Sequence, residues 1–122
     1  MSVTIKSKSD LLKLREAGRI AARALEHAGK VMHPGMTTKQ LDRSIHEFIV
    51  SCGAVPTFLG YGGFPASACI SINEEVIHGI PSNRRVIREG DIVSVDVGAT
   101  FDGFVGDTAY TFAVGDISEE KA

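Results

Sequence analysis

The sequence has no tryptophan, only two cysteines and no long apolar run. A helix that spans a membrane needs about 18 or more consecutive apolar residues. Cys52 and Cys69 lack the CxxC spacing of a zinc site, and they are too few for a disulfide framework. Positive charge is not in excess, because the net charge is −2 and the pI is about 6.1. We therefore expect a cytoplasmic protein with no nucleic acid and no membrane as partner, and with both cysteines reduced and buried.

The composition that is present indicates a single folded domain. The chain has 122 residues, of which 43% are hydrophobic and 23% are charged. This length suffices for one domain but not for two, and the apolar content is typical of a globular core rather than of disorder.

The clearest local pattern is a hairpin between residues 91 and 112. Asp102 and Gly103 separate two β-prone runs, and Asp-Gly is a strong turn signal because the tight turn needs positive φ. With these two residues as the turn, Gly98 lies opposite Asp107. Asp96 and Asp107 then become diagonal neighbours on one face, roughly 7 Å apart at their Cβ atoms. That spacing allows two carboxylates to converge on a cation.

The two faces of this hairpin differ in character. The face that carries the two aspartates is small and polar, and it allows two interpretations: solvated surface carboxylates, or a pair bridged by metal. The position of Asp96 in mid-strand favours the second, since aspartate is depleted in strands. The other face is expected to be core and consists of Val93, Val95, Val97, Tyr110 and Phe112.

Two helices are predicted before the hairpin. Ser9 and Asp10 can cap the first, whose apolar and small residues recur at three- and four-residue spacing as far as Ala28. A capping box at residues 37–40 predicts the start of the second helix, which ends near residues 52–53. His46 falls on the polar side of this helix, and we expect it to be solvated.

The segment between the second helix and the hairpin holds the other candidate site residues. A glycine-rich loop at residues 60–65 carries Tyr61 and Phe64, either as core aromatics beside an ordinary turn or as walls of a pocket. Residues 68–72 predict a strand. His78 follows between apolar residues, as a structural histidine or as a donor or acceptor that projects into a site.

Several motifs, in this order, resemble type I methionine aminopeptidase. They are Leu-Gly-Tyr at residues 59–61, Cys-Ile-Ser-Ile-Asn-Glu at 69–74, His-Gly-Ile-Pro at 78–81, Gly-Asp-Ile-Val at 90–93 and Gly-Asp-Thr at 106–108. The resemblance runs from about residue 5 to residue 114. It implies an α+β fold, the N-terminal half of a pita-bread fold, with two helices packed on an antiparallel β-sheet. It also implies a metallo-exopeptidase that removes the N-terminal methionine from nascent polypeptides.

The resemblance assigns roles to six residues. It implies that two divalent ions (cobalt, manganese, iron or zinc) are bound by Asp96 and Asp107. It implies that His78 is catalytic and contacts the substrate near the scissile amide. It places Tyr61, Phe64 and Cys69 in the wall of the methionine pocket. Gly62 stands where some members have histidine, so a contact from that side chain is absent.

The resemblance also indicates what residues 1–122 do not supply. Family members have a second half that contributes a histidine and two glutamates as further metal ligands. We therefore expect this half-domain to carry only part of the active site, to bind divalent metal weakly or not at all, and to be inactive alone. The alternative is a catalytically inactive half-domain that binds a partner, either the missing half or a second copy as a homodimer. Related enzymes that act on Xaa-Pro bonds are a third and weaker possibility.

Overall fold

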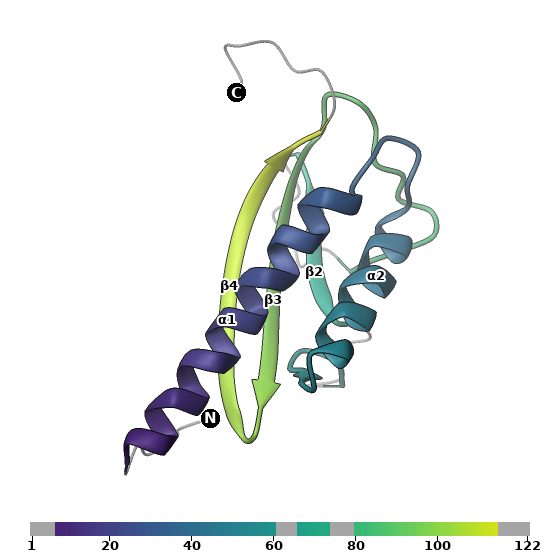
Figure 1. Ribbon diagram of the computed structural model, residues 1–122. Coiled ribbons are helices and arrows are strands. Elements are labelled where there is room, and N and C mark those ends of the chain that lie inside the picture. Colours follow the sequence, from purple (N-terminus) through teal and green to yellow (C-terminus); the bar gives the residue numbers. More distant parts are fainter. Residues whose placement is uncertain (1–6, 61–65, 74–79, 115–122) are drawn as a thin grey trace.

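The computed structural model describes residues 7–60, 66–73 and 80–114. Two helices, α1 (Lys8–Val31) and α2 (Thr38–Ser51), precede the strands β1 (Val55–Pro56), β2 (Ala68–Ile72), β3 (Ile92–Phe101) and β4 (Phe104–Ala113). Both helices lie side by side on one face of the sheet, α1 over β3 and β4 and α2 beside β2 (Figure 1). The predicted fold class, two helices packed on an antiparallel sheet, is confirmed.

Strand β3 is the centre of the sheet, because all the other strands pair with it. It pairs antiparallel with β4 along its whole length. Its other edge pairs antiparallel with β2 from Val93 to Val97 and with β1 at Ala99 and Thr100. Every strand contact is antiparallel, so the side chains of neighbouring strands stand opposite one another in pairs that share a face.

The ends of the helices follow from local capping. Helix α1 begins slightly earlier than predicted, because Ser7 is its N-cap and accepts a hydrogen bond from the Asp10 backbone at 3.1 Å. The predicted caps Ser9 and Asp10 lie instead within the first turn. The capping box of α2 is confirmed, with both reciprocal bonds between Thr37 and Gln40 present.

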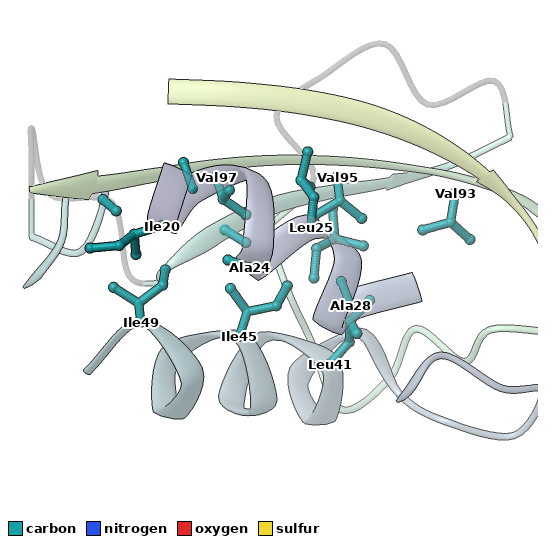
Figure 2. Packing of buried hydrophobic residues seen from close by; sticks show 14 of the residues in the cluster. Ile20, Ala24, Leu25, Ala28, Leu41, Ile45, Ile49, Val93, Val95 and Val97 are labelled. Carbon is teal, nitrogen blue, oxygen red and sulfur yellow. The ribbon is translucent and has the colours of Figure 1, made fainter. Parts of the chain in front are cut away.

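The core lies between the sheet and the two helices (Figure 2). Val93, Val95 and Val97 on β3 are fully buried, as the alternation predicted. Helix α1 contributes alanines on its buried side, and these let it approach the sheet closely. A Cβ atom at Gly106 would overlap backbone atoms of Ala17 and Gly18. Glycine is therefore required at this crossing of α1 and β4.

Tyr110 is not a core residue, in contrast to the prediction. It is 57% exposed, although it is paired with the buried Val95. The reason is that β4 is an edge strand and α1 is seated elsewhere on it, against Gly106 and against the ring of Phe112. Tyr110 instead packs its ring against that of Phe112, with the two centroids 5.0 Å apart.

The two cysteines are free, as expected, but they are half-buried rather than buried. Cys52 lies at the C-cap of α2 and Cys69 lies on β2. Among the helices of the described ranges, none is long and apolar enough to cross a membrane.

Candidate functional site

The β3–β4 hairpin has the register that the turn residues predicted. Asp102 and Gly103 form the turn with φ values of 51° and 86°, the two positive values that a type I′ turn needs. Gly98 is paired with Asp107, and Asp96 is paired with Ala109. The two carboxylates therefore lie on one face as diagonal neighbours. An ion pair of 3.0 Å between Lys13 and Asp102 ties the turn to α1.

When one of the two groups is protonated, the carboxyl groups of Asp96 and Asp107 can form a hydrogen bond with each other. Burial, that hydrogen bond and the negative charge of Asp107 together raise the pKa of Asp96 to about 6. At neutral pH the pair therefore carries negative charge. A bound cation would relieve this repulsion, as would a shared proton at lower pH.

Asp96 lines a shallow depression on the sheet face opposite the helices. Its volume is about 470 Å³, and its lining consists of Cys69, Ser71, Ser94, Val95, Asp96, Ala109, Tyr110 and Thr111. Cys69 on β2 is directly opposite Asp96 on β3. Ser94 and Thr111 join β3 to β4 through their hydroxyl groups at 3.2 Å. The depression is thus a surface of three strands, with Asp96 in its lining and the exposed Asp107 as the diagonal neighbour of Asp96 on the same face.

A segment that sequence reasoning did not assign to the site covers the same face at Gly98. A Cβ atom there would lie 3.0 Å from the ring of Phe58 and 3.0 Å from the side chain of Thr57. Thr57 also donates its backbone N–H to the Gly98 carbonyl at 3.0 Å. The available signal was a glycine in the middle of a strand rich in valine, which indicates close approach by another segment.

The donor set fits a divalent cation in its chemistry but is incomplete. Two neighbouring carboxylates are hard oxygen ligands of the kind that divalent ions bind. In the part of the chain that the structure describes, no group of three or more histidine, cysteine, aspartate or glutamate side chains is placed to hold a metal. Three of the predicted site residues, Tyr61, Phe64 and His78, lie outside the described residues.

Comparison with known proteins decides the family. The family model of metallopeptidase family M24 matches residues 12–122. The chain belongs to metallopeptidase family M24. A methionine aminopeptidase of Clostridium acetobutylicum is 54% identical over 120 residues, which are 98% of this chain and 48% of that protein. The chain thus spans about half the length of the curated relatives it matches.

Solved structures of M24 proteins show the same fold. The crystal structure of methionine aminopeptidase from Rickettsia prowazekii has a TM-score of 0.88 at 40% identity, and it covers 98% of this chain and 48% of its own. An X-Pro aminopeptidase from Thermotoga maritima has a TM-score of 0.74 at 23% identity, with 96% of this chain and 32% of its own covered, which shows the fold alone. The two helices and antiparallel sheet therefore match one half of the pita-bread fold.

M24 membership implies divalent metal. Among the described residues, the pair that suits such an ion is Asp96 and Asp107.

Proposed function

We propose that this chain acts in the metal-dependent removal of N-terminal methionine from polypeptides and contributes Asp96 and Asp107 to the metal site. The observation that carries the proposal is the pair itself, two carboxyl groups that are diagonal neighbours on the sheet face opposite the helices. The 54% identity to a methionine aminopeptidase supports the choice of reaction. The X-Pro aminopeptidase reported above, which bears on the Xaa-Pro alternative, is only 23% identical to this chain.

Each aspartate has a defined task in this proposal. The hairpin holds both carboxylates at fixed positions on adjacent strands, so they are preorganised to bind cations without a rearrangement of the backbone. Two divalent ions (cobalt, manganese, iron or zinc), when bound, would polarise the scissile carbonyl and activate water. Because the pKa of Asp96 is about 6, this carboxylate is mostly ionised and ready to bind at neutral pH.

The substrate in this proposal is a peptide with an N-terminal methionine, in the cytoplasm. Cys69 supports a pocket beside the acidic pair, since it lies opposite Asp96 on the neighbouring strand. Tyr61 and Phe64 are proposed as further walls of this pocket, and His78 as the catalytic contact to the scissile amide. These three assignments rest on the family resemblance.

The ligand count defines a second candidate function. A catalytic metal site usually has three or more protein ligands, whereas the described residues bring together two. We propose that the remaining ligands come from outside the described residues, and the family resemblance assigns them to a second half or to another chain. A half-domain that binds such a partner, including a second copy as a homodimer, is therefore the alternative to an enzyme that acts alone.

A chimera tests the proposed function. In it, this chain replaces the aligned 48% of the Clostridium acetobutylicum methionine aminopeptidase. Release of methionine from a Met-Ala-Ser peptide is measured with added manganese or cobalt, and we expect turnover. Asp96→Asn and Asp107→Asn should each lower kcat by at least about 100-fold, because loss of a partner of a metal ligand already costs about 10–100-fold.

Asp102→Asn is the matched control, since it neutralises an aspartate of the same hairpin that lies in the turn rather than in the acidic pair. Asparagine tolerates the positive φ of this position, so the turn is kept. This variant should retain activity. A folded chimera without turnover would favour the partner-binding alternative, and turnover that survives both Asp96→Asn and Asp107→Asn would refute the metal assignment.

A further inference from the structure

The described residues contain three buried polar side chains, and all three meet along α2. They are Thr38, Asp42 and Ser67, with exposed fractions of 1%, 7% and 1%. A carboxylate is almost never buried without compensation, because it loses its hydration. Burial accordingly raises the pKa of Asp42, and hydrogen bonds from two backbone amides oppose that shift.

These bonds all go to one short segment. Oδ1 of Asp42 accepts the backbone N–H groups of Ser67 at 2.9 Å and of Ala68 at 2.8 Å. One turn further along α2, Nδ1 of His46 bonds to the hydroxyl of Ser67 at 2.8 Å. His46 is therefore engaged rather than solvated, which corrects the prediction from its place on the polar side of the helix.

A second segment is held one turn earlier. The hydroxyl of Thr38 accepts the backbone N–H of Ser82 at 2.8 Å and donates to the carbonyl of Ser82 at 3.2 Å. Thr38, Asp42 and His46 are spaced by four residues, so they form one row on the helix surface, which we name the α2 polar row. The row binds Ser67 and Ser82. In the sequence, Ser67 follows shortly after the predicted site residues Tyr61 and Phe64, and Ser82 follows shortly after His78.

Asp42, His46 and Ser67 have the residue types of a hydrolytic triad, but their geometry does not fit one. Ser67 is 1% exposed, so no substrate reaches its hydroxyl. The Asp42 oxygen that would orient a histidine in such a triad accepts two backbone amides instead. The cluster therefore serves to hold the chain in place rather than to attack a substrate.

We propose that Asp42 is a positioning residue for the candidate site, because it anchors the start of β2 and so keeps Cys69 opposite Asp96. Strand β2 is five residues long and lies at an edge of the sheet. A slip of one residue would turn Cys69 away from the polar face, since strand side chains alternate. The two amides held by Asp42 belong to the residues just before Cys69. This inference rests on the proposed function only for the role of Cys69 as a pocket wall.

The test measures how fast the two thiols of the full chain react, so it does not depend on peptidase activity. N-ethylmaleimide labelling is followed by mass spectrometry of peptides, and the rate at Cys69 is divided by the rate at Cys52. Cys52 is the internal reference, because it packs against the core at the far end of α2. Asp42→Ala should raise this ratio by about tenfold, because the start of β2 detaches from the sheet more often once two amides lose their acceptor, and detachment exposes the Cys69 thiol (a factor of ten is about 1.4 kcal/mol).

Asp42→Asn is the conservative rescue, since one amide oxygen can accept both N–H groups as Oδ1 does now. It should keep the ratio within about twofold of the original chain. Thr37→Ala is the matched control: it removes the capping box and weakens α2 as a whole, so it should not raise Cys69 labelling selectively. If Asp42→Ala fails to fold, Asp42→Glu decides, because its longer side chain displaces the acceptor while the charge is kept.

Three results would overturn the proposal. They are an unchanged ratio in folded Asp42→Ala or Asp42→Glu, an equal increase at both cysteines, and an Asp42→Asn ratio as high as that of Asp42→Ala. The labelling result and the turnover of the chimera can be judged independently of each other. An inactive chimera with the expected labelling pattern would reject the peptidase function and leave the anchor intact.

Discussion

Asparagine in place of Asp96 should stabilise the metal-free chain at neutral pH. Burial and the neighbouring Asp107 raise the pKa of Asp96 to about 6 in the folded state, whereas an unfolded aspartate titrates near about 3.9. The folded state therefore binds more protons between these two values, and stability falls as the pH rises from about 4 to about 6. Above about pH 6, Asp96 is ionised in the folded chain, and the full cost of its burial beside Asp107 lowers the stability of the fold. The asparagine side chain would not ionise, and its amide could still donate to Asp107.

The size of the effect follows from the shift. About two pKa units correspond to about 3 kcal/mol if the group is fully shielded from solvent. Asp96 is partly exposed, and solvent screening reduces this figure to about 1 kcal/mol. For a domain of this size, that change raises the Tm by about 3–5 °C. Most of the gain should disappear by pH 4, where Asp96 is protonated in the folded chain.

Thermal unfolding in the presence of a chelator, at pH 7.5 and at pH 4, measures this difference. Asp102→Asn serves as the control, because it removes an exposed carboxylate and its ion pair with Lys13 without touching the acidic pair. An exposed ion pair contributes little to stability, so the control should be neutral or slightly destabilising. A loss of Tm in Asp96→Asn of the same size at both pH values would refute the electrostatic argument and assign Asp96 a purely structural role.

Four further outcomes are expected. The isolated chain should release no methionine from a Met-Ala-Ser peptide with manganese or cobalt, and turnover that Asp96→Asn abolishes would contradict this. Calorimetry should detect one loose divalent site or none, since two carboxylates are too few ligands to offset dehydration of the ion; a tight isotherm for two ions would show that more ligands are present. Sedimentation equilibrium at micromolar concentrations should show a homodimer or larger species, because open sheet edges recruit other strands; a strict monomer would contradict it. Gly106→Ala should lower the free energy of unfolding in urea by about 3 kcal/mol, because its Cβ meets the backbone of α1. Gly18→Ala is its control: a Cβ there meets nothing within 4 Å, so it should instead stabilise α1 by about 0.5–1 kcal/mol, and equal losses in both variants would rule out the close-contact explanation.

The hairpin was predictable because its determinants are local. Two turn residues with positive φ set the register, and strand alternation then placed Asp96 and Asp107 on one face. Tyr110 was wrongly assigned to the core because alternation shows which face of a strand a residue lies on, but not how much of that face the helices cover. That extent depends on where α1 crosses β4, and the crossing is determined by the contact of Gly106 with α1.

The buried row on α2 could not be predicted in the same way. The capping box of Thr37 and Gln40 lies within four residues, so the sequence shows both partners together. Asp42 bonds to amides that lie 25 and 26 residues further along the chain. A helical pattern shows which side of a helix is apolar, but it does not show which distant backbone groups need an acceptor there.

The short span of the turn has a consequence for the order of folding. Asp96 and Asp107 are separated by ten residues, and hairpins close in about 1–10 μs. The contacts of α1 with β4 join far more distant parts of the chain, so we expect them to form later. The two acids would then meet while water still surrounds them and their repulsion is weak. Thr57 and Phe58 would cover β3 at Gly98 only later, when Asp96 becomes partly buried while Asp107 stays exposed. A substitution of Gly103 should therefore slow folding, whereas a substitution of Phe58 should chiefly speed unfolding.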